Sequence, residues 1–224
     1  MSIVFLQRID TLSDGSMIQT TTLLELVLKG GVVMIPIALL SIIAVYIFVE
    51  RYLTIRKAAN IDADFIPNIR DFMVNGNIAA AQALCKRHDS PVARMIEKGI
   101  TRIGKPLRDI EASIENVGKL ELFKLERGLS LLATISGAAP MLGFLGTVTG
   151  MVKAFYNMAN AGNNIAIDLL AGGIYEALIT TVAGLVVGIF SFVAYNILVN
   201  MVNQVVHKME ATSIEFIDLL QEPA

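Results

Sequence analysis

Three long apolar windows interrupt an otherwise amphipathic chain. Residues 30–49, 128–152 and 177–206 contain no Asp, Glu, Lys, Arg or His. A helix needs roughly 20 apolar residues to cross the hydrocarbon core of a bilayer. Each window therefore predicts a transmembrane helix. Because the last two windows are longer than a bilayer requires, we expect those helices to continue beyond the lipid on one side.

The segment between the first two windows shows helical periodicity, with apolar residues recurring three and four positions apart. These residues are Phe65, Ile69, Phe72, Met73, Val92, Met95, Ile96, Ile103, Ile110, Ile114 and Val117. Turn-forming residues interrupt the pattern at 75–77, 90–91 and 104–106. The pattern predicts a small helical bundle outside the lipid. Leucines at 23–28, after three threonines, predict an interfacial helix before the first span.

Composition and charge place this bundle on the cytoplasmic side of a membrane. The chain is 54% hydrophobic and 17% charged, which is too apolar for an ordinary soluble domain. Residues 51–127 carry 14 Lys and Arg and 10 Asp and Glu, whereas the rest carries 4 and 10. By the positive-inside rule, the basic segment is cytoplasmic. Three spans then place the amino terminus outside and the carboxyl terminus inside. The amino terminus lacks the features of a removable signal peptide, and the single Cys85 excludes an intrachain disulfide.

The expected fold is all-α: a polytopic membrane protein with three transmembrane helices, two of them extended into a cytoplasmic helical bundle. The expected divisions are a periplasmic amino terminus with the interfacial helix (1–29), transmembrane helix 1 (30–50), a cytoplasmic helical segment (51–127), transmembrane helix 2 (128–156), a periplasmic loop (157–171), transmembrane helix 3 (172–206) and a cytoplasmic tail (207–224).

Small residues recur at four-residue intervals in the second and third windows. Gly146 and Gly150 form one such interval, and Thr180, Gly184 and Gly188 form a longer series. This pattern is typical of membrane helices whose backbones approach closely. It indicates helix packing, either within one chain or around a pore, and the two roles are compatible.

Two threonines lie at similar predicted depths in the membrane. Thr147 is about nine residues before the outer end of the second span, and Thr181 about nine residues after the outer start of the third. Both hydroxyls are therefore expected roughly 14 Å below the outer face. Hydroxyls at one level can bridge waters or relay a proton. The alternative is that each bonds the carbonyl four residues before it in its own helix.

Glu176 lies at the outer end of the third span. Carboxylates within membranes are costly and indicate function. The alternative is a carboxylate favoured by the helix dipole and wetted by the interface. Glu176 is too near the surface to carry protons at the midplane, and threonine hydroxyls hold no charge. A proton path here therefore needs a titratable group from another chain.

Other chemistry finds no support. His88 and His207 are far apart, and no HxxxH or CxxC motif indicates a metal site. No Walker or GxGxxG motif indicates nucleotide binding, and nothing indicates nucleic-acid binding. We expect neither an enzyme nor a cofactor. Tyr195 and Asn196 in the inner half of the third span are expected to pack between helices, or to hydrogen-bond there.

At the level of motifs, the second and third spans resemble a known family. Residues 139–155 read APMLGFLGTVTGMVKAF, and residues 175–196 read YEALITTVAGLVVGIFSFVAYN. These are similar to the paired signatures APxLGxLGTVxGM…F and EAL…T…GLxxxI…YN of the ExbB/TolQ/MotA proton-channel family. The first span, followed by Glu50 and Arg51, also resembles that family's first span. The similarity covers nearly the whole chain.

The resemblance implies a pentamer of this subunit around two transmembrane helices of a smaller ExbD-like or TolR-like partner, whose membrane Asp carries the proton. It implies that Thr147, Thr181 and Glu176 stand on the proton pathway. The residues expected to pack helices are Pro140, Gly143, Gly146, Gly150, Thr180, Gly184, Gly188, Tyr195 and Asn196. Many relatives have a proline where this chain has Phe190, so no proline bend is expected there.

Three spans in 224 residues favour the ExbB/TolQ branch over four-span flagellar stators. The expected function is the stator subunit of a motor in the bacterial inner membrane. It is driven by protons and energises TonB-dependent import through a TonB-like protein. A TolQ-like subunit of the Tol-Pal envelope system is the alternative. A non-conducting membrane scaffold is less favoured, since it would use the same glycines but would not need Glu176 or the two hydroxyls. A metabolite transporter is less favoured still, since no inverted repeat or broken helix pair is visible.

Overall fold

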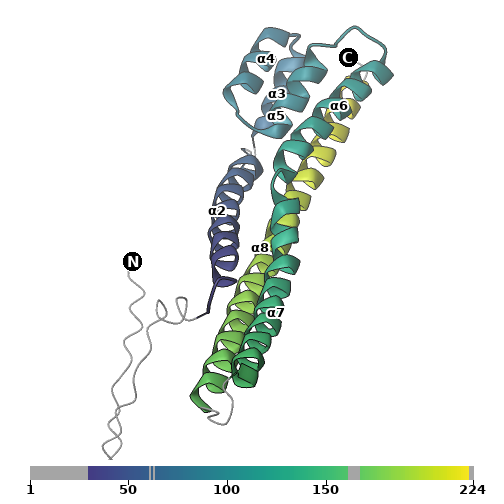
Figure 1. Ribbon diagram of the computed structural model, residues 1–224. Coiled ribbons are helices and arrows are strands. Elements are labelled where there is room, and N and C mark those ends of the chain that lie inside the picture. Colours follow the sequence, from purple (N-terminus) through teal and green to yellow (C-terminus); the bar gives the residue numbers. More distant parts are fainter. Residues whose placement is uncertain (1–29, 61, 63, 161–166, 222–224) are drawn as a thin grey trace, which may run out of the picture. The chain divides into compact units, whose positions relative to one another are not determined.

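The computed structural model describes residues 30–60, 62, 64–160 and 167–221 (Figure 1). Every regular element in this described part is a helix, which confirms the all-α fold. The helices are α2 (Met34–Ala59), α3 (Phe65–Val74), α4 (Ile78–Arg87), α5 (Pro91–Ile100), α6 (Leu107–Glu126), α7 (Leu129–Asn160) and α8 (Ile167–Gln221). The expected interfacial helix within 1–29 lies outside the described residues, as do residues 161–166 of the expected outer loop. The rest of that expected loop is helical, because α7 continues to Asn160 and α8 begins at Ile167.

Within the described residues, three helical stretches are long and apolar enough to cross a membrane. They are Met34–Ala59, Leu107–Asn160 and Leu170–Gln221. Large apolar side chains on all three are exposed, including Ile42, Phe144 and Val186. Such surfaces suit lipid better than water. The chain is therefore a polytopic membrane protein, and its described part contains the three spans that the apolar windows predict.

The long helices differ from the predicted segments at their ends. Helix α2 continues past residue 50 to Ala59, because Ile55 and Ala58 are buried and give this end an apolar face. Helix α8 runs unbroken from Ile167 to Gln221, through Phe190 and most of the predicted tail. Helices α6 and α7 are separated at Gly128, whose φ of 83° lies in the left-handed region that favours glycine.

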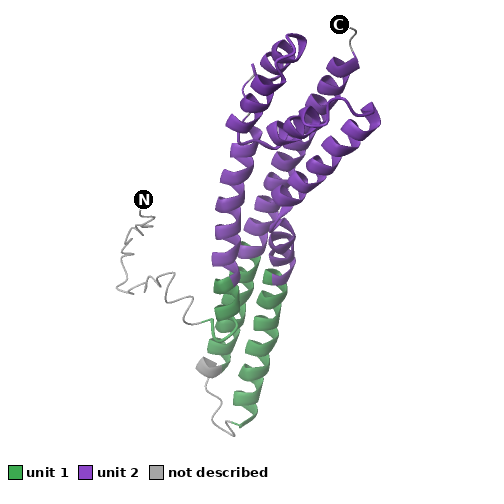
Figure 2. Cartoon of the chain, turned by 90° about the horizontal axis from the view of Figure 1, so that it is seen from above, with its two compact units in different colours: residues 1–39, 139–186 green, residues 40–138, 187–224 purple. Residues whose placement is uncertain are grey.

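The described chain divides into two compact units (Figure 2). Unit 1 contains residues 1–39 and 139–186, of which residues 1–29 and 161–166 are outside the description. Unit 2 contains residues 40–138 and 187–224. The boundaries fall within α2, α7 and α8, so each of these helices contributes to both units.

The short helices of unit 2 begin and end where turn residues predict. Asn77 accepts a hydrogen bond from the Ala80 amide and caps α4. Ser90 does the same for the Ala93 amide at the start of α5, whose first residue is Pro91. Side-chain oxygens satisfy amide donors that a helix start leaves without partners, and proline fits the first helical turn.

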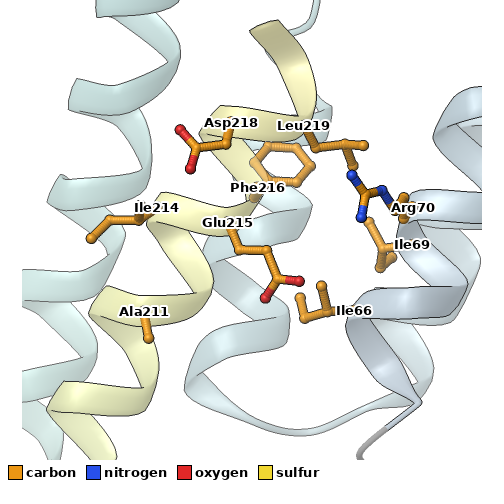
Figure 3. A pocket seen from close by; sticks show the side chains of 9 residues that line it. All are labelled: Ile66, Ile69, Arg70, Ala211, Ile214, Glu215, Phe216, Asp218 and Leu219. Carbon is orange, nitrogen blue, oxygen red and sulfur yellow. The ribbon is translucent and has the colours of Figure 1, made fainter. Parts of the chain in front are cut away.

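Unit 2 has a core of large apolar side chains. Phe65 of α3, Ile96 of α5, Ile114 of α6 and Phe216 of α8 are almost fully buried. Near the end of α8, a pocket of about 320 Å³ separates it from α3. Figure 3 shows Glu215 and other α8 side chains facing α3 across this pocket.

Charged groups in unit 2 are linked across helices. Glu121 of α6, only 5% exposed, accepts from Arg94 Nη2 at 2.6 Å and from Lys124 Nζ at 2.7 Å. Arg94 also donates to Asp89, which accepts from Lys57 at 2.9 Å. The hydrogen bonds from Lys57 and then Arg94 hold the pKa of Asp89 below its ordinary value. These links connect α2, α5 and α6.

Candidate functional site

Helices α7 and α8 approach each other through glycines in unit 1. We call this contact, between residues 139–154 of α7 and 173–184 of α8, the seam. A Cβ atom added at Gly184 would lie 2.5 Å from the Ala139 carbonyl oxygen and 2.9 Å from Gly143 Cα. One added at Gly143 would lie 2.9 Å from the Thr180 carbonyl oxygen. The seam is therefore a backbone-to-backbone contact that larger residues exclude.

The same contact continues toward the C-terminal end of α7 and the N-terminal end of α8. Gly150 faces Ala177 and the Gly173 carbonyl oxygen, each 3.0 Å from where its Cβ would lie. Gly146 faces the Thr180 side chain, which is buried and donates to the Ala177 carbonyl oxygen at 2.8 Å. The small residues predicted to pack helices thus meet one another here.

The Thr147 and Thr181 hydroxyls are in direct contact across the seam. The Gly143 carbonyl oxygen lies 3.3 Å from Thr147 Oγ1 and 3.1 Å from Thr181 Oγ1. The Ala177 carbonyl oxygen lies 3.2 Å from Thr147 Oγ1 and 3.3 Å from Thr181 Oγ1. Each hydroxyl thus has three acceptors in reach: its own helix's carbonyl, the facing helix's carbonyl and the other hydroxyl.

This arrangement allows proton exchange but cannot hold a charge. Each threonine hydroxyl has one proton to donate and two lone pairs that accept. The two hydroxyls therefore donate two protons among more acceptors than they can satisfy together, and several hydrogen-bond patterns have similar geometry. Both side chains are only partly buried. The pair is suited to pass hydrogen bonds along a chain of groups, provided that a titratable group lies beside it.

Glu176 pairs with a residue that the sequence alone did not single out. Glu176 Oε2 lies 3.0 Å from Lys153 Nζ of α7. The Glu176 side chain is 23% exposed and the Lys153 side chain 62%. A Cβ atom at Gly31, just before α2, would overlap Glu176 Oε1. The ending of the apolar window at Val152, directly before a lysine, was the signal available for Lys153.

The structure brings the two threonines together but gives Glu176 other partners. On an α-helix, positions 176 and 181 are about 140° apart, and positions 147 and 153 are about 120° apart. The hydroxyl pair and the ion pair therefore lie on different flanks of the seam. The two are linked through the backbone, because Ala177, whose carbonyl faces both hydroxyls, directly follows Glu176.

The remaining predicted packing residues have varied surroundings. Pro140 lies inside α7 and is half-buried, and Gly188 of α8 is buried. Tyr195 is half-buried. Asn196 is exposed and donates to the Phe192 carbonyl oxygen of its own helix at 2.8 Å. Thus the hydrogen bond that the structure gives Asn196 lies within α8 and does not join two helices.

Metal chemistry has no ready set of ligands in the described part of the chain. There, no three His, Cys, Asp or Glu residues come together as a metal site would require. Burial raises the pKa of the Cys85 thiol to about 12, so this thiol stays protonated at neutral pH.

Comparison with known proteins gives named relatives. Over 188 residues, the chain is 32% identical to the putative biopolymer transport protein ExbB-like 1 of Synechocystis sp., with 83% of this chain and 74% of that protein covered. Over 191 residues, it is 31% identical to the putative biopolymer transport protein ExbB homolog of Methanothermobacter thermautotrophicus, with 84% and 67% covered.

A third relative covers a shorter part. The chain is 35% identical over 101 residues to the biopolymer transport protein ExbB of Xanthomonas campestris pv. campestris, with 45% of this chain and 40% of that protein covered. Residues 87–211, which include the hydroxyl pair and the ion pair, match the profile of the MotA/TolQ/ExbB proton channel family. Together with the three apolar helices, these matches show that the chain belongs to the MotA/TolQ/ExbB proton channel family.

Proposed function

We propose that the chain is the stator subunit of an ExbB-like motor in the bacterial inner membrane. It would use the proton-motive force, with an ExbD-like partner, to energise TonB-dependent import. The observation that carries this proposal is the direct contact between the Thr147 and Thr181 hydroxyls inside apolar helices. Hydroxyls within reach of two transmembrane helices can pass hydrogen bonds along a proton path, and the valine variants below separate this role from packing.

The titratable group that carries the proton must come from another chain. The seam offers hydroxyls but no titratable group at its centre, and Glu176 lies nearer the outer end of α8. A membrane Asp of a single-span partner would supply the missing group, with Thr147 and Thr181 facing it and Glu176 serving nearer the outer surface. A homopentamer around the partner's helices would enclose such a path.

The names of the relatives favour an ExbB-like over a TolQ-like role. The relatives named above carry ExbB in their names. The three spans of the described residues separate the chain from the four-span flagellar stators but suit both ExbB and TolQ. A TolQ-like role remains the alternative, and complementation of a strain lacking one system or the other separates them. Growth that depends on TonB-mediated uptake supports ExbB, whereas restored envelope integrity supports TolQ.

The proposed orientation places residues 51–127 in the cytoplasm and both the amino terminus and residues 157–171 in the periplasm. A cysteine introduced at Asn75 should react with an impermeant maleimide only in inverted vesicles, and one at Asn163 only in whole cells. The native Cys85 is buried with a raised pKa, so its background labelling is low. Labelling of position 75 from the periplasm contradicts this orientation.

Proton flux into vesicles tests the function. The purified chain alone should not conduct, whereas the complex with an ExbD-like partner should. Thr181→Val and Thr147→Val keep the side-chain shape and remove the hydroxyl, so each should lower flux while the complex stays assembled. If one water chain uses both hydroxyls, the double variant should lose less than the two separate losses combined.

Thr149→Val is a matched control. Its hydroxyl is bonded to carbonyl oxygens of its own helix, Leu145 at 3.0 Å and Gly146 at 3.1 Å. This variant should leave flux unchanged. Full flux in either Val variant at 147 or 181, or flux through the chain without its partner, would assign the threonine pair to packing alone.

A further inference from the structure

An ion pair joins α7 to α8 at the outer end of the seam. Lys153 Nζ lies 3.0 Å from Glu176 Oε2, with the carboxylate side chain 23% exposed. Lys153 immediately follows an apolar window, and Glu176 comes immediately before another. Long charged side chains near the ends of transmembrane helices can reach the interface, so cost alone does not force these two groups to pair. The pair therefore reflects a specific arrangement of two helices.

The glycine contacts of the seam set the geometry of this pair. Lys153 follows Gly150 by three residues, and Glu176 follows Gly173 by three residues. A Cβ at Gly150 would lie 3.0 Å from the Gly173 carbonyl oxygen, so the two backbones touch at this level. One helical turn further along each chain, the two charged side chains flank that contact. Their approach thus depends on the same close packing that brings the hydroxyls together.

The other oxygen of the carboxylate is confined from a third segment. Gly31 has a φ of 68°, and a Cβ atom there would overlap Glu176 Oε1. The chain before α2 therefore passes close to the carboxylate, and the left-handed backbone conformation at Gly31 favours glycine. Lys153 on one side and the Gly31 backbone on the other leave Glu176 little choice of position.

We propose that Lys153 is a positioning residue for Glu176. Its ammonium group holds the carboxylate at the outer end of the seam, against Gly31 and off the flank that bears the hydroxyl pair. This inference rests on the proposed function, in which Glu176 serves the proton path. Without Lys153, the carboxylate is released from this place, and proton passage slows although the helices remain packed by their glycines.

Variants of the complex with an ExbD-like partner test the proposal. Lys153→Gln removes the charge and should lower proton flux into vesicles about fivefold, the change that corresponds to about 1 kcal/mol of pairing energy. Lys153→Arg keeps the charge and should retain most of the flux. Lys119→Gln is the matched control, because Lys119 also pairs with a glutamate, Glu115, and is similarly exposed. It should leave flux unchanged.

A charge exchange separates positioning from mere stabilisation. Lys153→Glu combined with Glu176→Lys keeps an ion pair but moves the carboxylate to α7. If Lys153 acts by positioning the carboxylate on α8, this double variant should assemble, as judged by size-exclusion chromatography, without restoring flux. Restored flux would mean that the pair only fastens two helices and would overturn the proposal. Loss of assembly in both Lys153→Gln and Lys153→Met would overturn it as well.

A second measurement detects the contact between Lys153 and Glu176 without measuring proton flux. Carbodiimide treatment of the complex should form an amide between Lys153 and Glu176, detected by mass spectrometry of the peptides. Absence of this cross-link, or wild-type flux in Lys153→Gln, overturns the positioning role while the proposed function stands. Absence of flux from the wild-type complex overturns the proposed function, and the positioning role with it, even where the cross-link forms.

Discussion

The seam of unit 1 and the helical bundle of unit 2 use glycine in different ways. In the seam, a Cβ atom at Gly184 would meet the backbone atoms of Ala139 and Gly143. In the bundle, a Cβ atom at Gly99 would meet the tips of the Phe216 and Ile114 side chains. Backbone cannot move aside without shifting a helix, whereas the end of a side chain can.

The seam and the bundle also differ in how their polar groups are partnered. The seam shares hydroxyl protons among carbonyl oxygens, with several patterns of similar geometry. The bundle fixes the buried Glu121 between Arg94 and Lys124, each at a short distance. The seam therefore fixes the spacing of two backbones and allows several hydrogen-bond patterns, whereas the bundle leaves room for side-chain adjustment and fixes its charged pairs. Rigid spacing with exchangeable protons suits conduction, and a fixed charge network suits a support.

The largest expected effect is on the seam. Gly184→Leu forces an isobutyl group into a backbone contact and should abolish the assembled complex, at a cost at or above about 3 kcal/mol. Gly137→Leu is the control, because no atom lies within 4 Å of the Cβ position there. Size-exclusion chromatography and thermal melting in detergent measure both. A normal complex with Gly184→Leu would show that the helices are not in contact at this glycine.

Removing volume from the bundle should have the next largest effect. Phe216→Ala deletes a buried ring and should lower the free energy of unfolding by about 3–5 kcal/mol, whereas Val74→Ala on the exposed face of α3 should change it little. Gly99→Ala together with Phe216→Ala should cost less than the two changes added, since the lost ring makes room for the methyl group. Strict additivity in thermal melting would contradict this contact.

A moderate effect is expected from breaking the charge network. Arg94→Met leaves the buried Glu121 with Lys124 alone and should lower the free energy of unfolding by about 2 kcal/mol. Adding Glu121→Leu should recover most of that loss, because no buried charge then remains. Lys119→Met, at an exposed pair, should change stability by less than about 0.5 kcal/mol. If Lys119→Met and Arg94→Met lower the melting temperature equally, the burial of Glu121 gives its ion pair no special role.

The smallest expected effect is the pH dependence of the stability that Asp89 contributes. Hydrogen bonds from Lys57 and then Arg94 lower the pKa of Asp89, so the folded protein binds a proton there less readily than the unfolded chain. The stabilisation is thus fully present above the unfolded pKa and is lost as pH falls through the lowered folded pKa. Wild type should melt above Asp89→Asn at pH near 7, and the gap should close in acid and narrow in high salt. A gap that widens in acid would contradict the sign.

Local patterns along the chain were sufficient to identify the elements, although not to place the ends of the long helices. The apolar windows predict all three spans, and Asn77, Ser90 and Pro91 lie at helix starts as their capping chemistry requires. The spacing of Gly143, Gly146 and other small residues predicts helix contact, because small residues on one helical face allow another backbone to approach, whichever helix that is. The matched depths of Thr147 and Thr181 were readable because rise per residue is constant in a helix.

Tertiary structure alone decided which side chains meet across helices. Depth along a helix is counted from sequence, but rotation about its axis is set by packing, so the direct contact of the two hydroxyls needed the seam itself. Lys153 and Glu176 are 23 residues apart, and Arg94 and Glu121 are 27 apart, with no local pattern that pairs them. An ion pair depends on where two helix surfaces are brought together, and that is decided by the glycine contacts and buried side chains between them.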